Sequence, residues 1–428
     1  MLTAALIGAG RRGRDIYGGI IKDNCTGLKI NAVAEPSIIK RKLTGWQHKI
    51  PQKNQFSCYE KMLSKDKLSD ALLITTLDHK HYYPTIKGIE NGYKILLEKP
   101  ITPNFEQLKD MAFHVKNKSN EIIITHTLRY TSFYKKIKEI IDKDIIGKIK
   151  SINHKENVGY FHFAHSYVRG KWRDETTSAP LFLAKSSHDF DLFTWLLGKR
   201  CVEVLARGEQ SYFKQENHPA NAGKRCLSCS IESDCPYSAL HIYLSRDEEN
   251  PWPKVISRDF PPRPVIKLGI KYTDLGRCVF LCNSTMPEFL EAYLKYEDNI
   301  NVNFTLNGLS KNMNRITCFY GTKGELKADF EKNKIIINHF KGEKQIIEPP
   351  VKAGYHGGGD INMIEDFIDF LYKGSGNKDL TTFEASIESH LTAFAAEKSR
   401  LSKKKVSLDF FRTELNNVRG LTAARATS

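Results

Sequence analysis

A glycine-rich motif near the N-terminus constrains the fold of this chain more than any other feature. The apolar run Leu2–Ile7 leads directly into Gly8-Ala9-Gly10-Arg11-Arg12-Gly13, and Glu35 ends the next apolar run. A strand, a glycine turn, a helix start and an acidic residue about 20 positions later are typical of the first βαβ unit of a dinucleotide-binding domain. The motif therefore predicts a parallel, doubly wound sheet that begins at the N-terminus.

Each residue of the motif has an expected task. Gly8 would form the tight turn, Gly10 would let the backbone approach a pyrophosphate, and Gly13 would let the helix pack closely on the sheet. The first turn of the helix would offer N–H groups and a partial positive charge to the phosphates. Arg11 and Arg12 would add cations that screen the phosphate charge.

Alternating strand-like and helix-like segments over the first 125 residues agree with that fold. The segment Phe105-Leu108-Ala112-Val115 keeps the apolar stripe of a helix, and Thr102-Pro103 ahead of it is a good helix start. This alternation favours a Rossmann domain over residues 1–126. Its predicted strands are Leu2–Ile7, Leu28–Ala34, Ala71–Thr75, Tyr93–Leu97 and Glu121–Thr125.

A second domain is expected over residues 127–428, because strand-like segments there follow one another without regular helices between them. They indicate a large, mainly antiparallel open sheet in an α/β domain. Residues 209–287, rich in Pro, Cys and Tyr, are predicted to form an irregular insertion, and residues 361–373 and 383–400 to be helical. The predicted strands are Lys148–Glu156, Val202–Gly208, Ala292–Leu306, Asn314–Tyr320 and Lys334–Phe340.

Composition excludes several classes of protein. Of the residues, 40% are hydrophobic and 27% are charged, which is ordinary for a folded protein. No stretch approaches the roughly 18–20 apolar residues of a membrane span, and the N-terminus lacks the basic start of a secretion signal. The net charge is +16, but the basic residues are spread along the chain, so we expect no nucleic-acid partner. We expect a cytoplasmic location with reduced thiols.

Further motifs give the chain a family resemblance. They occur in the expected order along most of the chain, about residues 1–410, and Glu98-Lys99-Pro100 is the most specific. The chain resembles the Gfo/Idh/MocA oxidoreductases. The motifs are Gly8–Gly13, Thr76–His81, Glu98-Lys99-Pro100, Gly147-Lys148-Ile149, Ser187–Leu192, Trp195–Gly198 and His356-Gly357-Gly358-Gly359-Asp360.

The resemblance implies NAD(P)-dependent oxidation or reduction of a sugar, an inositol-like polyol or a sugar acid. It also implies that the open sheet serves as an oligomer interface, so a homodimer or homotetramer is expected. Two alternatives stay open. Some relatives are redox-neutral, NAD-dependent glycosidases, and others bind the nucleotide and regulate without catalysis.

Two residues are the main catalytic candidates. The resemblance makes Lys99 the catalytic lysine, and a partly desolvated ammonium there would have a lowered pKa, so that it could accept a hydroxyl proton. His188 would hydrogen-bond the reacting hydroxyl or relay its proton. The resemblance also places Thr76, His79, His81 and Glu98 at the cofactor.

The chain departs from the family beside His188. Many members have an aspartate four residues before this histidine, whereas this chain has Ala184 there, followed by Lys185. Lys185 could replace the aspartate as a substrate hydrogen-bonder, keep Lys99 neutral by charge repulsion, or hold an anionic group of the substrate.

Several polar and aromatic residues suit a sugar site, because aromatic faces pack on C–H surfaces while Arg and His donate to hydroxyls. Two of them follow the fifth predicted strand, three lie just ahead of the segment that carries His188, and one lies in the late glycine loop. The candidates for substrate contacts are Arg129, Tyr130, His165, Arg169, Trp172 and His356.

The insertion holds a cysteine cluster. Cys226 and Cys229 have two residues between them, and Cys235 follows after five more. Thiolates at such spacing suit a structural zinc, and Cys282 completes the predicted set, with Cys278 or His241 as alternatives for the fourth ligand. Reduced thiols without metal are the competing interpretation.

Glu35 generates a prediction about the cofactor. A carboxylate at this position would accept hydrogen bonds from a ribose hydroxyl and repel a 2′-phosphate, so NAD is expected over NADP. Lys40 and Arg41 are close in sequence and keep NADP as the alternative. Michaelis constants for the two cofactors test this, and a clear preference for NADP would contradict it.

Overall fold

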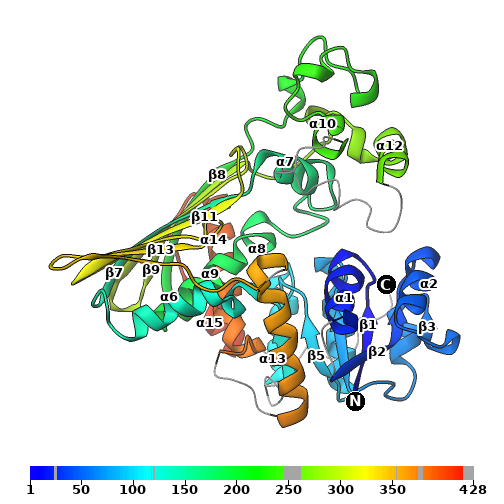
Figure 1. Ribbon diagram of the computed structural model, residues 1–428, viewed down its shortest axis with the longest axis horizontal. Helices are drawn as coiled ribbons and strands as arrows, with labels where there is room; N and C mark the ends of the chain where they lie inside the picture. The colour runs from blue at the N-terminus through cyan, green and yellow to red at the C-terminus, as the bar shows by residue number, and fades with distance from the viewer. Residues whose placement is uncertain are drawn as a thin grey trace.

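The N-terminal sheet is parallel, as the glycine motif predicts. The computed structural model describes residues 1–23, 27–116, 118, 121–244, 262–352, 354–374 and 379–417. Within them, six parallel strands lie in the order β3-β2-β1-β4-β5-β6 (Figure 1). The strands are β1 (Leu2–Ile7), β2 (Leu28–Ala34), β3 (Gln55–Phe56), β4 (Ala71–Ile74), β5 (Lys94–Leu97) and β6 (Ile122–Ile124).

Helices connect these strands and bury the sheet. The helix after the glycine motif starts with π-type geometry, η1 (Arg11–Tyr17), and continues as α1 (Gly18–Asp23). Asn104 caps α5 by accepting from Gln107 N at 3.1 Å, so the helix begins after Asn104. The others are α2 (Ile38–Gln47), α3 (Tyr59–Leu63), α4 (Tyr82–Glu90) and α5 (Phe105–Val115).

The second sheet is large and mostly antiparallel, as predicted. Within the described residues its order is β14-β13-β12-β11-β7-β10-β9-β8-β15, and β7 and β10 alone run parallel. The strands are β7 (Ile149–Asn157), β8 (Cys201–Glu209), β9 (Phe289–Tyr296), β10 (Ile300–Asn307), β11 (Asn314–Gly321), β12 (Gly324–Asp329), β13 (Lys334–His339), β14 (Lys344–Ile347) and β15 (Val406–Ser407).

One predicted strand was wrong as a single unit. Residues 292–306 form a hairpin of β9 and β10, because Asp298 and Asn299 adopt positive φ angles of 58° and 55° and reverse the chain between them. Asp and Asn tolerate this left-handed region better than most residues.

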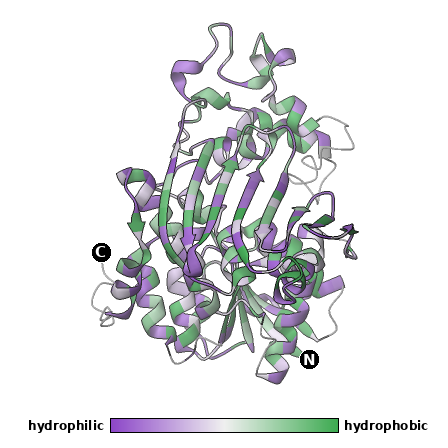
Figure 2. Ribbon diagram, turned by 90° about the vertical axis from the view of Figure 1, so that its left-hand side faces the viewer, coloured by the Kyte–Doolittle hydropathy of each residue, from purple (hydrophilic) through white to green (hydrophobic). Residues whose placement is uncertain are grey.

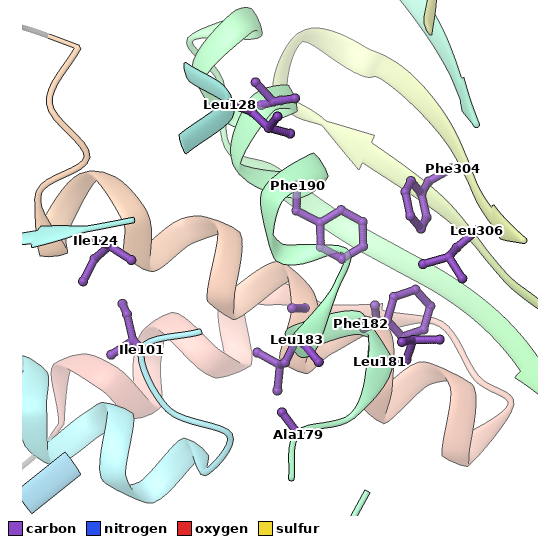
Figure 3. Packing of buried hydrophobic residues seen from close by; sticks show 14 of the residues in the cluster. Ile101, Ile124, Leu128, Ala179, Leu181, Phe182, Leu183, Phe190, Phe304 and Leu306 are labelled. Carbon is purple, nitrogen blue, oxygen red and sulfur yellow. The ribbon is translucent and has the colours of Figure 1, made fainter. Parts of the chain in front are cut away.

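Helices cover one face of the second sheet. Along β10, buried and exposed residues alternate, as expected for a strand with one face in the core. Phe182, Phe190 and Phe304 belong to this core (Figure 3). In Figure 2 hydrophobic and hydrophilic residues alternate along the strands of this sheet. The covering helices include α6 (Ser132–Asp142), α8 (Leu181–Ala184), α9 (Ser187–Leu197), α14 (Phe383–Ser402) and α15 (Leu408–Asn416).

A late helix returns to the first domain. Helix α13 (Gly359–Lys373) packs on η1, α1 and the turn η5 (Thr127–Tyr130). Its Phe367 and Phe370 share an apolar cluster with Tyr17 and Ile20. The C-terminal part of the chain therefore completes the core of the Rossmann domain and brings the glycine loop before α13 to its edge.

In residues 209–244 and 262–287, the described part of the predicted insertion, the elements are short helices and helical turns. Its elements include η8 (Cys226–Ser228), η9 (Glu232–Asp234), α10 (Ala239–Leu244), α12 (Pro262–Tyr272), η10 (Asp274–Gly276) and η11 (Val279–Leu281). Among the described residues, no helix is both long and apolar enough to cross a membrane.

A buried ion pair holds the segment that follows β6 against helix α9. Arg129, just after β6, donates to both oxygens of Asp191 on α9, with both distances 2.6 Å. The side chains are 5% and 1% exposed, so neither charge is solvated by water. This position corrects the interpretation of Arg129 as a substrate contact: its charge is balanced inside the protein.

Replacing one partner of this pair should destabilise the protein strongly. In Asp191→Ala the Arg129 guanidinium stays buried without a counter-charge, which costs about 3–5 kcal/mol. We expect that loss in the free energy of unfolding measured with urea. The control Glu90→Ala removes the exposed ion pair with Lys87 and should change the free energy of unfolding by less than about 1 kcal/mol. Equal effects of the two substitutions would contradict a stabilising role of the buried pair of Arg129 and Asp191.

Candidate active site

The candidate site lies where the carboxyl ends of the parallel strands face the second domain. Doubly wound sheets place their ligands at this edge. The glycine motif follows β1, Asp78 follows β4, and Lys99 follows β5. Lys99 also contacts the second domain: its Nζ donates to the carbonyl of Ala184, the last residue of α8, at 2.5 Å. The site is therefore built from both domains.

The glycine loop has the shape of a phosphate cradle. Gly8 has a φ of +90°, and a Cβ there would lie 2.8 Å from the Thr75 carbonyl oxygen; a Cβ on Gly13 would lie 2.3 Å from the Gly8 oxygen. A Cβ on Gly10 would meet no atom within 4 Å. Gly8 and Gly13 are thus required by close packing, whereas Gly10 faces open space that a pyrophosphate can occupy.

Other polar groups at this edge fit a dinucleotide. Glu35 accepts hydrogen bonds from Ala9 N at 2.8 Å and Ser37 N at 3.0 Å, which places its carboxylate beside the glycine loop. The Thr76 hydroxyl is buried without a hydrogen-bond partner. Arg41 donates to the Glu35 carbonyl oxygen at 2.5 Å. The chemistry of these donors and acceptors fits NAD, with Glu35 at the ribose.

The two histidines of the strand-end segment differ. His81 is fully buried, and its Nδ1 donates to the Pro100 carbonyl at 2.8 Å. It therefore ties the end of β4 to the segment that carries Lys99. His79 is exposed at the end of the 3-10 turn after β4.

Arg12 binds two carboxylates beside the glycine loop. Its Nε donates to Glu98 at 2.6 Å and its Nη2 to Asp360 at 2.7 Å, while its guanidinium stacks 4.6 Å from the centre of the Tyr17 ring. Burial alone would raise the pKa of Glu98, but Arg12 and the Tyr17 hydroxyl hold it below its usual value. Arg12 is thus paired with carboxylates, and its role at the phosphates stays a prediction. Arg11 remains exposed at the loop.

Lys99 has the electrostatics of a base. Burial lowers its pKa to about 8, with Asp78 and Glu98 opposing the shift and Lys185 and Arg12 adding to it. A fraction of the amine is therefore neutral near physiological pH, as proton abstraction from a hydroxyl requires.

Asp78 is a site residue that the sequence analysis did not single out. Its carboxylate is 5% exposed and accepts from Trp172 Nε1 at 2.9 Å. Burial raises its pKa, against the charges of His81 and Lys99. The sequence could have indicated Asp78, because it lies in the Thr76–His81 motif after β4, and β4 pairs with β5, the strand that Lys99 follows. Trp172 thus reaches the site through Asp78.

His188 stands in a group of histidines. Its ring centre lies 5.7 Å from that of His126 and 6.1 Å from that of His356. Burial, together with the charges of Lys99 and His126, holds the pKa of His188 well below its usual value, so it is neutral at pH 7. Its Nδ1 is buried without a partner. His356 donates to Asp360 at 2.8 Å and so connects to Arg12.

Lys185 belongs to a buried charge network. Its Nζ lies 3.0 Å from Glu156, whose other oxygen lies 2.5 Å from Arg315 Nε. The same Arg315 nitrogen lies 2.9 Å from Asp189. His154, Glu156 and Asp189 are close enough together to hold a cation, but the Arg315 guanidinium already balances both carboxylates. Lys185 is 13% exposed and keeps access to the cleft.

Other predicted substrate contacts have hydrogen-bond partners within the protein. Tyr130 is buried and shares a hydrogen bond with Thr381 at 2.8 Å, and Arg169 donates to backbone carbonyls of the insertion. Neither presents its polar group to the cleft, which corrects both interpretations. His165 shares a hydrogen bond with Tyr243 at 2.8 Å. Burial lowers the pKa of His165, and the charge of Arg11 lowers it further.

Comparison with known proteins places this geometry in a family. Residues 2–126 match the Gfo/Idh/MocA family domain described as an oxidoreductase NAD-binding Rossmann fold, and residues 138–408 match its C-terminal alpha/beta domain. The Bacillus subtilis protein named "Putative oxidoreductase YteT" is 22% identical over 347 residues, 78% of this chain and 79% of that protein. Inositol 2-dehydrogenase of Corynebacterium glutamicum is 24% identical over 47% of this chain and 56% of that enzyme.

Solved structures agree on the fold. Scyllo-inositol dehydrogenase from Lactobacillus casei, solved with NAD(H) and scyllo-inositol, has a TM-score of 0.66 at 17% identity over 96% of this chain and 99% of that one. An oxidoreductase from Agrobacterium radiobacter, solved with NAD+, L-tartaric acid and magnesium, has a TM-score of 0.68 at 13% identity over the same shares. The chain belongs to the Gfo/Idh/MocA family of oxidoreductases, with an NAD-binding Rossmann domain.

Proposed function

We propose that this protein oxidises a hydroxyl-bearing carbon of a sugar, an inositol-like polyol or a sugar acid, with NAD as the hydride acceptor. The observation that carries the proposal is Lys99: a largely buried amine with a pKa of about 8, at the same sheet edge as the glycine cradle. Inositol dehydrogenases are among the proteins that this chain is similar to, which supports a polyol as the class of substrate.

The residues divide the work in this proposal. Bound NAD supplies the hydride-accepting carbon. Lys99 takes the hydroxyl proton as hydride leaves, and Asp78 stabilises the ammonium that forms. Neutral His188 hydrogen-bonds the substrate hydroxyl through a ring nitrogen. Arg11, exposed at the glycine loop, brings positive charge to the site, which favours substrates with a carboxylate.

A substrate panel tests the proposal. The protein is incubated with NAD and with cyclic polyols, aldoses, sugar acids and aryl glycosides, while NADH absorbance is followed. We expect NADH from at least one polyol, sugar or sugar acid. Release of the aglycone without net NADH would instead establish a redox-neutral glycosidase. Tight NAD binding with neither product would establish a non-catalytic nucleotide-binding protein.

Removing the Lys99 amine should abolish turnover without loss of the cofactor. In Lys99→Ala we expect kcat to fall by about 10²–10⁴-fold, the range of general acid–base contributions, while the Kd for NAD, measured by calorimetry, stays the same. Lys80→Ala, an exposed lysine beside His81, is the matched control and should keep full activity. Near-normal turnover of Lys99→Ala would remove it from the mechanism.

Two substitutions near Lys99 should shift the pKa seen in the pH dependence of kcat/KM in opposite directions. Oxidation needs neutral Lys99, so kcat/KM should rise with pH through a pKa of about 8 in the unmodified protein. Asp78→Asn removes a negative charge that favours the ammonium, so this pKa should fall. Lys185→Met removes a positive charge and unmasks Glu156, so the pKa should rise.

The pair of variants distinguishes this electrostatic role from simple damage. A structural defect lowers kcat/KM at all pH values, whereas a change of charge moves the midpoint of the profile. Shifts in the same direction, or no shift in either variant, would show that the titrating group is not Lys99.

A further inference from the structure

Four cysteines of the insertion surround one cavity. Cys226 and Cys229 flank the η8 turn, Cys235 follows η9, and Cys278 precedes η11. All four line one cavity, together with Arg169. Cys282 does not line it: its Sγ donates to the Cys278 carbonyl at 3.2 Å. His241 is exposed on α10. Of the three candidates for the fourth ligand, Cys278 is the one that lines this cavity.

Backbone groups already point at the sulfurs. Ala239 N donates to Cys226 Sγ at 3.4 Å, and Gly223 N donates to Cys229 Sγ at 3.2 Å. A Cβ on Gly223 would lie 2.8 Å from the Ser228 carbonyl oxygen, so glycine lets this amide come close. Amide donors to cysteine sulfur are a common feature of metal–thiolate centres, where they stabilise the negative charge on sulfur.

Arg169 brings a buried charge to the same cavity. It is 3% exposed, and it donates to the carbonyls of Arg277 at 2.8 Å and Tyr237 at 2.7 Å, and to Cys226 Sγ at 3.6 Å. Its Nη1 is buried without an acceptor. Across the described residues, no Asp or Glu forms an ion pair with it. A buried guanidinium without a counter-charge is costly, and an anionic metal–thiolate centre would supply that charge.

The spacing of the sulfurs distinguishes between metals. A tetrahedral zinc with Zn–S bonds of about 2.3 Å brings its sulfurs to about 3.8 Å from one another. In the part of the chain that the structure describes, the sole set of three ligand atoms within 4.8 Å of one another is His154, Glu156 and Asp189. No three of the four sulfurs therefore lie within 4.8 Å of one another, which is wider than a tetrahedral zinc needs and is compatible with a cubane cluster that has one thiolate at each iron.

We propose that Cys226, Cys229, Cys235 and Cys278 bind a [4Fe–4S] cluster, with Arg169 balancing its negative charge. The cluster has a positioning role. Arg169 ends η6 (Ala164–Arg169), which carries His165, and Trp172 beyond it donates to Asp78. The cluster thereby fixes the segment that borders the cleft from the side of the insertion. This proposal does not depend on the proposed oxidation.

Metal and sulfide analysis tests the cluster directly. The full chain is purified without oxygen from cells supplied with iron, and iron, acid-labile sulfide and zinc are quantified. We expect about four irons and four sulfides per chain, with broad visible absorption and a Mössbauer signal of a cubane cluster. One equivalent of zinc without iron, or neither metal in folded protein, would overturn the proposal.

Substitutions identify the ligands. Cys278→Ser and Cys229→Ser should lose most of the iron, whereas the matched control Cys282→Ser should keep it. Iron retained in Cys278→Ser but lost in Cys282→Ser would overturn the assignment. Because a lost ligand could unfold the insertion, Arg169→Lys and Arg169→Met provide a second measurement on loaded protein. Arg169→Met should lower the midpoint potential of the cluster, Arg169→Lys should shift it less, and an unchanged potential in both would remove Arg169 from its charge balance.

Discussion

Arg12 holds together three parts of the chain that are far apart in sequence. Its guanidinium joins the first turn after the glycine motif to Glu98, beside Lys99, and to Asp360 at the start of α13. Asp360 in turn binds His356, next to His188. The cofactor loop, the lysine and the late glycine loop are therefore fixed relative to one another by one buried cation. Because each carboxylate is buried, each depends on this cation for its charge.

The lowered pKa of Lys99 is the result of opposing influences. Burial favours the neutral amine, two carboxylates favour the ammonium, and two cations favour the neutral form again. Asp78 is the carboxylate on the cleft side, while Glu98 is already paired with Arg12. The buried pair of Arg129 and Asp191 fixes α9 to the segment that follows β6, and Lys99 itself contacts the end of α8 through the Ala184 carbonyl.

The parts of the structure that local patterns encode were predictable. The glycine motif, the apolar runs and the alternation of strands and helices led to both sheets, and the Glu-Lys-Pro motif led to Lys99. Pairing between distant side chains was not predictable. The sequence around an arginine does not show whether the side chain binds a phosphate or a carboxylate. Arg12 was expected at the phosphates, and it binds Glu98, more than 80 residues away. The same holds for Arg129 with Asp191, and for Cys278, which packing brings to the cysteine cluster in preference to Cys282.

The network around Lys185 restricts how this enzyme can be redesigned. Glu156 and Asp189 share Arg315, and Lys185 supplies the second cation that makes the network neutral. Introducing an aspartate at position 185 alone would leave three acidic groups around one guanidinium. A variant library aimed at the substrate range should therefore vary positions 156, 184 and 185 jointly, because most single exchanges there would be lost to misfolding before their selectivity could be assayed.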